Sequence, residues 1–475
     1  MSIEVTINWD SGPESYTTIS KHYSNYQTDP RLIEISEINR AQGLDYSLEN
    51  PTVKFVLSNH DRIISEKIKT DDPKGKEITI KDNGDIIFSG VICDTPDSDN
   101  PDRCISKGDI FSKLESNINL EISKDRFPNV PEGNKGWGNI IYGTAAAAPG
   151  MMKATRIDTN KYHASYTALS QILDVVKKDG TSILSSITWN VENGYTYINY
   201  NSTDDFIYFS GKGPEQSGTL IENPASMLQH LTENFANGKF QVEGVEAAEP
   251  VFTERNYTGN VLFIDDNMTW IQLFKLFSQN FNCRVFPTRT GNIKIKVIRW
   301  GMETPKMTIH PSLLKGFKFR RETKQIRKKW MRQYNYDVSQ KKYLRTEFDI
   351  DGGNSEKLGE FPHKFLVPDI CSRDVSLRES FFKKKPIIVY TFSIPKEYAN
   401  QLDLGDTVLI KSRKNLFENE YRQVEILRES RNPGSGFVTF EGYDMTEIHK
   451  RTFILQEPGH PEVAILGETD GPTLW

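Results

Sequence analysis

The segment 221–297 constrains the fold of this chain most, because it is predicted to form two amphipathic helices followed by a β-hairpin. The first helix is expected to begin after Asn223, whose side chain can cap it. Pro224 then takes the first helical position, where a missing N–H costs nothing. The apolar residues that follow recur at helical spacing: Leu228, Leu231 and Phe235. A helix is therefore predicted directly after the cap.

The second helix is expected to begin at Asp266–Asn267, and it places Trp270 and Phe274 on one apolar stripe. Over 283–297 the apolar residues alternate instead, and Gly291 lies in the turn of a predicted hairpin. These residues are suited to packing and to turning the chain, and none of them is a common catalytic type. This segment therefore indicates structure rather than chemistry.

Strands are predicted for most of the remaining chain. Aromatic residues make up 11% of the sequence, and Thr, Ile and Val are abundant. In the N-terminal region, Asn83-Gly84 separates the apolar runs 78–80 and 86–88, which is a strong hairpin signal. A chain of 475 residues is also too long to fold around a single hydrophobic core. We therefore expect a multi-domain, mainly β fold with α+β insertions.

Changes of pattern and clusters of proline suggest five units along the chain. They are an N-terminal β-barrel (1–126), an α+β domain (127–215), a helix-helix-hairpin domain (216–310), a second β-barrel region (311–450) and a C-terminal tail (451–475). The tail is rich in proline, glycine and acidic residues, and we expect it to become ordered only against a neighbour.

Two of these units carry more specific expectations. In 127–215, a helix capped near Ser165 is expected to present an apolar face as far as Val176, and Asn193-Gly194 is expected to turn a hairpin. In 311–450, a short helix is expected around 374–382, and Leu404-Gly405-Asp406 is expected to form a turn before a strand. Further strands of that small barrel are predicted at 387–394, 407–410, 422–427 and 437–440.

The segment 315–345 is strongly basic, with twelve Lys or Arg residues and only two acids. Interleaved aromatic residues would suit nucleic-acid binding. The alternative is a strand with one apolar and one basic face, as in Phe317-Lys318-Phe319-Arg320. The second interpretation is favoured, because the whole chain has a net charge of -5, which argues against a dedicated nucleic-acid binder.

No catalytic or metal-binding pattern is present in the sequence. Zinc-protease, nucleophile-elbow, phosphate-loop and dinucleotide motifs are all missing, so we predict neither an enzyme nor a cofactor. The acidic loop from Asp94 to Arg103 and the run 349–354 are interpreted as solvated turns rather than calcium sites, and His230 as an edge-of-core residue. The four cysteines lack metal spacing, and no apolar run is long enough to span a membrane.

The order of these parts resembles the baseplate hub, or tail-tip hub, proteins of tailed bacteriophages. The resemblance extends from about Val53 to Met445. It depends on the order of the Asn83-Gly84 hairpin, the segment 137–143, the Asn223-Pro224 helix, the hairpin with Gly291 and the late Gly405-Asp406 strand. Its structural residues are therefore Asn223, Pro224, Trp270, Phe274, Gly291, Gly405 and Asp406.

The resemblance implies two tube-like barrel domains accompanied by peripheral α+β domains. Members of the family form homotrimers whose paired barrels match a six-fold tail tube on one side and a three-fold tip on the other. The implied partners are the ring-forming distal tail protein, the tape-measure protein and a tail fibre or spike protein, with DNA passing through the channel without sequence-specific binding. The implied location is the tail tip of a virion assembled in a host cytoplasm.

Two other classes of function remain open from the sequence. A receptor- or carbohydrate-binding tail protein would expose an aromatic groove, for which Trp137, Trp189 and Trp330 are candidates. A cell-wall hydrolase of the tail tip is the second alternative, although no motif supports it.

Overall fold

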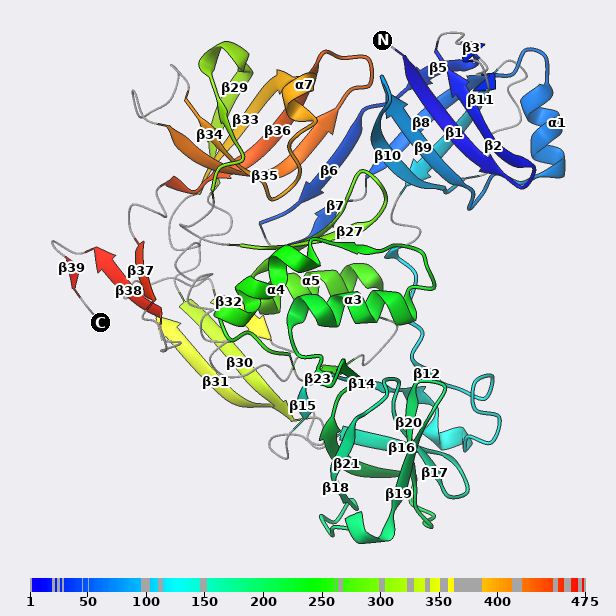
Figure 1. Cartoon of the computed structure of the whole chain (residues 1–475), viewed down its shortest axis with the longest axis vertical. Coiled ribbons are helices and arrows are strands. Elements are labelled where there is room, and N and C mark those ends of the chain that lie inside the picture. Colours follow the sequence, from blue (N-terminus) through cyan, green and yellow to red (C-terminus); the bar gives the residue numbers. More distant parts are fainter. Residues whose placement is uncertain are drawn as a thin grey trace.

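The computed structural model is mainly β and multi-domain, which confirms the predicted fold class (Figure 1). Two curved sheets lie at the top of Figure 1, a helical unit lies below them, and a further sheet lies at the bottom. The structure describes residues 2–18, 22–23, 26–27, 30–44, 46–49, 51–94, 103–109, 114–145, 152–259, 261–263, 268–298, 304–322, 329–337, 342–350, 358–362, 387–411, 421–446, 452–456, 463–468 and 472–473.

The first curved sheet is antiparallel throughout, and within the described residues its strand order is β2-β1-β9-β10-β11-β8-β5. The strands are β1 (Ile3–Trp9), β2 (Gly12–Thr17), β5 (Leu32–Ile35), β8 (Thr52–Ser58), β9 (Glu77–Asp82), β10 (Asp85–Ile92) and β11 (Arg103–Asp109). The predicted hairpin is confirmed: Asn83 and Gly84 join β9 to β10 with φ of 52° and 96°, as a tight primed turn requires. Helix α1 (Ile63–Thr70), which buries Ile64, was not predicted.

The second curved sheet has the order β28-β34-β35-β36-β33-β29 in the described part of the chain. Its strands are β28 (Met307–Ile309), β29 (Lys315–Glu322), β33 (Ile387–Pro395), β34 (Thr407–Ile410), β35 (Arg422–Arg431) and β36 (Phe437–Asp444). Helix α7 (Lys396–Ala399) follows β33. The strands predicted from 387, 407, 422 and 437 onward are all confirmed.

One strand of the second sheet comes from the N-terminal region. Strand β6 (Ile38–Gln42) pairs antiparallel with β35, placing Arg40 opposite Glu429, and β7 (Leu48–Glu49) pairs with β6. Because only two residues separate β6 from β5, and only two separate β7 from β8, the excursion ties the two curved sheets closely together. The pairing of β6 with the second sheet was not predicted.

The helical unit occupies the centre of Figure 1, below the two curved sheets. Its elements are α3 (Pro224–Phe235), β24 (Val242–Glu243), α4 (Val245–Glu254), α5 (Trp270–Phe281), β26 (Cys283–Pro287) and β27 (Ile293–Val297). Both predicted helices and the hairpin are confirmed, although α5 is capped by Thr269, and Asp266–Asn267 lie outside the described residues. Helix α4, which contains Pro250, was missed.

The part of the chain that follows the first sheet in sequence and precedes α3 contains a further sheet, at the bottom of Figure 1, with a separate core. We call it the peripheral sheet. In the described residues its order is β15-β21-β16-β17-β20-β19, and β18 also pairs with β21. The strands are β15 (Thr144–Ala145), β16 (Met152–Asp158), β17 (Lys161–Ser165), β18 (Gln171–Val176), β19 (Thr188–Glu192), β20 (Tyr195–Asn199) and β21 (Phe206–Lys212).

The predicted helix from Ser165 to Val176 is wrong, because β17 ends at Ser165 and β18 covers 171–176. Its apolar residues face a sheet core, where Ile172 and Val175 are buried on either side of a register shift in the β18–β21 pair. Such a shift breaks strict alternation and imitates helical spacing. The Asn193-Gly194 hairpin is confirmed between β19 and β20.

The remaining strands form small sheets. They are β3 (His22–Tyr23), β4 (Tyr26–Gln27), β12 (Glu121–Ile122), β13 (Gly136–Trp137), β14 (Asn139–Ile141), β22 (Glu215–Gln216), β23 (Thr219–Leu220), β25 (Val261–Phe263), β30 (Lys329–Asp337), β31 (Lys342–Ile350), β32 (Leu358–Pro362), β37 (Thr452–Gln456), β38 (Val463–Glu468) and β39 (Pro472–Thr473). Strands were not expected in the C-terminal tail. The helix predicted at 374–382 lies outside the described residues, as do positions 95–102 of the acidic loop.

Candidate functional site

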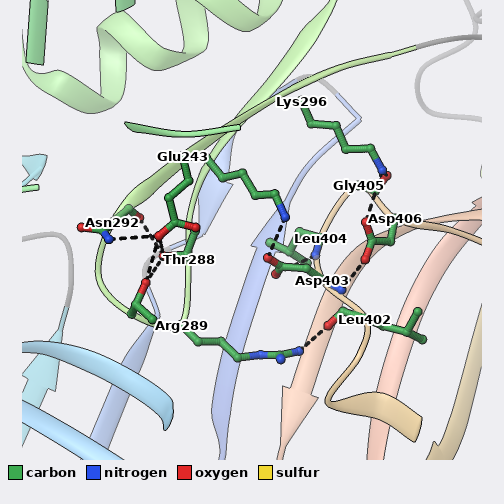
Figure 2. A network of polar contacts seen from close by, with 12 residues as sticks. Glu243, Thr288, Arg289, Asn292, Lys296, Leu402, Asp403, Leu404, Gly405 and Asp406 are labelled. Atoms are coloured by element: carbon green, nitrogen blue, oxygen red, sulfur yellow. Dashed lines mark hydrogen bonds and ion pairs between the residues drawn. The ribbon is translucent and has the colours of Figure 1, made fainter. Parts of the chain in front are cut away.

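A dense network of hydrogen bonds and ion pairs lies where three parts of the chain meet. These parts are strand β6, the β26–β27 hairpin of the helical unit, and the second sheet with the turn that follows α7 (Figure 2). We call this region the ionic junction. It is the candidate functional site, because it fixes the first sheet, the second sheet and the helical unit to one another.

Glu429 on β35 is the centre of the ionic junction, and its side chain is 1% exposed. Arg40 Nε donates to its Oε2 at 2.9 Å, Arg289 Nη2 donates to its Oε1 at 2.6 Å, and Arg431 forms a third ion pair with it. Burial alone would raise the pKa of Glu429, but the three guanidinium groups outweigh that cost and hold the pKa well below its usual range. Glu429 therefore stays ionised inside the protein.

Three arginines carry more positive charge than one glutamate can balance. The guanidinium N–H groups that do not bond to Glu429 donate to other acceptors. Arg40 Nη2 donates to Asp403 at 2.8 Å. Arg289 donates to the carbonyls of Asn400 at 3.2 Å and Leu402 at 2.5 Å, both just after α7. Buried guanidinium groups require such partners, so the turn after α7 is part of the ionic junction.

The predicted Gly405-Asp406 turn lies in the same region (Figure 2). Lys296 of β27 donates to the Gly405 carbonyl and to Asp406 Oδ1, the latter at 3.3 Å. Asp406 Oδ2 accepts from Lys306 at 2.9 Å and from the backbone N–H of Asp403 at 2.8 Å. Gly405 has φ of +73°, a conformation that suits glycine. This turn therefore binds the hairpin through both its backbone and its carboxylate.

The tip of the hairpin contacts the first sheet. Gly291 has φ of +81°, and a Cβ atom there would lie 3.1 Å from the Ser89 carbonyl on β10. The adjacent Asn292 donates to Glu243 at 3.0 Å, which holds β24 against the turn (Figure 2). The first sheet also reaches the second sheet directly, since Asp85 accepts from Asn400 at 2.6 Å.

A second buried ion pair lies further along the hairpin. Arg284 on β26 donates to Glu425 on β35 at 2.5 Å, and Tyr443 donates to the same carboxylate. The side chains of Arg284 and Glu425 are 3% and 5% exposed. The hairpin is therefore bonded to β35 at two separate places.

The other predicted structural residues belong to the interior of the helical unit. Asn223 accepts from the Ala225 N–H at 3.0 Å, with Pro224 at the start of α3. Trp270 and Phe274 pack around Phe240, with ring centroids 5.2 and 5.8 Å from it. Gly291, Gly405 and Asp406 are the members of the predicted set that the structure brings to the ionic junction.

The residues that dominate the ionic junction were not predicted from the sequence as site residues. They are Arg40, Arg289, Asp403 and Glu429. Arg40 and Glu429 are 389 positions apart, so no local spacing relates them. The predicted strand stopped at Leu427, so the charged residues that extend it to Arg431 carried no signal of their own.

The charged groups of the ionic junction are paired with one another. Within the residues that the structure describes, no group of three or more His, Cys, Asp or Glu side chains could hold a metal ion. In the same residues, no helix is long and apolar enough to cross a membrane. His230 bonds to Tyr142 Oη through Nδ1 at 3.0 Å, beside the core as expected.

Comparison of the sequence with protein-family models and with curated protein sequences gives no match. Among solved structures, the fold is similar to a tail protein from Neisseria meningitidis MC58, with 8% identity, 93% of this chain and 96% of that chain covered, and a TM-score of 0.48. It is also similar to the 43 kDa tail protein of prophage MuSo2 from Shewanella oneidensis (8% identity, 92% and 96% covered, TM-score 0.44). A third similar structure is the prophage tail protein gp18 from Listeria monocytogenes EGD-e (10% identity, 93% and 94% covered, TM-score 0.44). These structural neighbours are phage tail proteins, the class that the order of parts in the sequence resembles.

Proposed function

We propose that this protein is a structural hub of a phage tail tip, which acts as a homotrimer and joins a six-fold tail tube to a three-fold tip. The observation that carries the proposal is the pair of curved sheets in one chain. They are joined by the ionic junction and by strand β6, which follows β5 of the first sheet along the chain and pairs with β35 of the second. Three such chains would supply six sheets, the number required to match a six-fold tube.

Rigidity between the two sheets supports this role. A subunit in a ring must keep its two sheets at a fixed angle, because a flexible pair would not close with defined symmetry. The short β5–β6 and β7–β8 connections, the buried Arg40–Glu429 pair and the hairpin all restrict that angle.

The proposal also specifies partners. The ring would bind the distal tail protein above it, the tape-measure protein within it and a fibre or spike protein below it, and DNA would pass through the channel during ejection. The peripheral sheet and the helical unit would lie outside the ring. No catalytic step is part of this function.

The mass of the purified protein, measured by light scattering over a concentration series, is the first test. We expect a species of about three times the 54.4 kDa of one chain, with large interfaces of more than about 2,000 Å² per pair. Labelled antibody against this protein should then bind purified tails at the tip. Binding along the tail shaft, or to no tail component, would contradict the proposal.

A further inference from the structure

The outer face of the peripheral sheet carries a group of lysines and aromatic rings that the proposed function does not use. Strands β16 and β21 pair so that Lys153 lies opposite Tyr208 and Thr155 lies opposite Phe206. Tyr208 and Phe206 are therefore two positions apart on β21. Side chains two positions apart on a strand share a face, so Lys153, Tyr208 and Phe206 lie on one side of the sheet. Lys153 is exposed, and both rings are half-buried.

Two ammonium groups converge on one ring. Lys153 Nζ lies 4.6 Å from the Phe206 ring centroid, and Lys178 Nζ, from the turn after β18, lies 5.8 Å from it. Phe206 and Tyr208 meet edge to face, with centroids 5.7 Å apart. We call Lys153, Lys178, Phe206 and Tyr208 the lysine-aromatic patch.

A third lysine lies beside the lysine-aromatic patch. Lys177 Nζ is 5.8 Å from the Tyr200 ring, and the hydrogen bond to Tyr200 raises the pKa of this lysine. The neighbouring carboxylates have bonds of their own: Asp205 with Arg156 at 3.1 Å, Asp179 with the Thr181 N–H at 2.9 Å, and Asp204 with Ser202 at 2.8 Å. A hydrogen bond does not neutralise a carboxylate, so this face combines three ammonium groups and aromatic surface with the charges of these neighbouring carboxylates.

We infer that the lysine-aromatic patch binds an acidic polysaccharide of a cell surface. Ammonium groups attract carboxylate or phosphate without fixing its orientation, which suits a flexible repeating polymer. Phe206 offers apolar contact area for a sugar ring, and Tyr208 adds a hydroxyl that can hydrogen-bond to it. The site adds host-surface binding to the structural role.

The position of the patch separates this ligand from DNA. Strands β16, β18 and β21 belong to the sheet at the bottom of Figure 1, whereas the two curved sheets assigned to the channel lie at the top. A ligand at the patch therefore meets the protein outside the proposed DNA path. The inference does not depend on the trimer, because every residue of the patch comes from one chain.

The test uses the full chain and three immobilised probes at low salt: polygalacturonate, neutral dextran and a double-stranded DNA fragment. We expect binding to polygalacturonate and none to dextran. The double variant Lys153→Gln/Lys178→Gln should weaken polygalacturonate binding by about tenfold, because two of the attracting charges are lost. The charge-preserving variant Lys153→Arg/Lys178→Arg should retain it.

The matched control is Lys74→Gln/Lys239→Gln, which removes two exposed lysines elsewhere on the surface. Equal weakening in this control would overturn the inference, because the binding would then reflect net charge alone. Equal binding to dextran, or a patch variant that loses DNA as strongly as polygalacturonate, would also overturn it. Unchanged thermal unfolding of each variant confirms that the fold is intact.

Discussion

Glu429 shows how strongly a single buried charge can depend on its partners. Its carboxylate is ionised only because Arg40, Arg289 and Arg431 surround it, and those arginines in turn need the carboxylate. Removing the Glu429 carboxylate leaves three guanidinium groups close together in the interior. Arg40 keeps its bond to Asp403, but Arg289 and Arg431 lose the carboxylate that they share. That loss is far larger than the net contribution of the intact pair.

The variant Glu429→Gln should therefore lower the free energy of unfolding by about 3–5 kcal/mol. The matched variant Glu441→Gln breaks a bidentate pair with the exposed Arg320, formed at 2.7 and 2.8 Å, and should cost less than about 1 kcal/mol. Urea denaturation monitored by circular dichroism measures both. Similar losses for the two variants would show that the ionic junction adds no special stability.

The buried side chain of His163 should make the stability of the protein depend on pH. It lies among Phe127, Tyr166 and Tyr197, its buried ring nitrogens make no hydrogen bond to another residue, and burial, assisted by Arg126, lowers its pKa to about 3. Below pH about 6.5 the unfolded chain binds a proton that the folded protein does not, so stability falls as the pH decreases from there.

His163→Phe should remove that loss, which amounts to about 1–2 kcal/mol between pH 6.5 and 5, while changing stability little at pH 8. Thermal unfolding measured across this pH range tests it. Parallel curves for the variant and the natural protein would show that His163 takes up its proton equally in the folded and unfolded states.

At the scale of elements, strand β6 makes a sharp geometric prediction. Asn39 lies directly opposite Ser430 in the β6–β35 pair, and opposing residues have Cβ atoms about 4.5–5.5 Å apart. Cysteines at both positions should form a disulfide within one chain under mild oxidation, detected by peptide mapping. The control pair Asn39→Cys/Ser393→Cys should not, because Ser393 is two strands further away, opposite Thr439. A disulfide between chains would instead indicate that β6 is exchanged between subunits.

The same strand shows what could be predicted from the sequence. Asn83-Gly84, Asn193-Gly194 and the Asn223-Pro224 cap specify local conformations, and all three were predicted correctly because the determining residues are adjacent. The β6–β35 pairing depends on residues nearly 400 positions apart, for which one sequence holds no signal. The helix expected at 165–176 failed because a register shift in β18 imitates helical spacing.

In the candidate site too, the local turn could be predicted from the sequence and its distant partners could not. Gly405 and Asp406 were singled out because a Gly-Asp turn before a strand is visible in the sequence, and they lie in the ionic junction. Their partners Lys296 and Lys306 were ordinary lysines in the sequence, since only the fold brings them to the turn. Buried ion pairs of this kind are tertiary features, and composition does not identify them.

For the whole molecule, the ionic junction predicts that the two curved sheets open together. The first sheet shares a core with the helical unit, and the second sheet has a separate core. However, β6, the hairpin and the Asp85–Asn400 bond connect the two sheets, so neither can unfold without breaking bonds to the other. Native-state hydrogen exchange should therefore give the same opening free energy for amides of β1 and β9 as for those of β33 and β36.

In Glu429→Gln the second sheet should open at lower free energy than the first, because the buried arginines then favour the open state. Glu441→Gln, on the outside of the same sheet, should leave the two values equal. If the sheets already open independently in the natural protein, the angle between them is not fixed by the ionic junction, and the rigid pair that the proposed ring requires would have to come from subunit contacts instead.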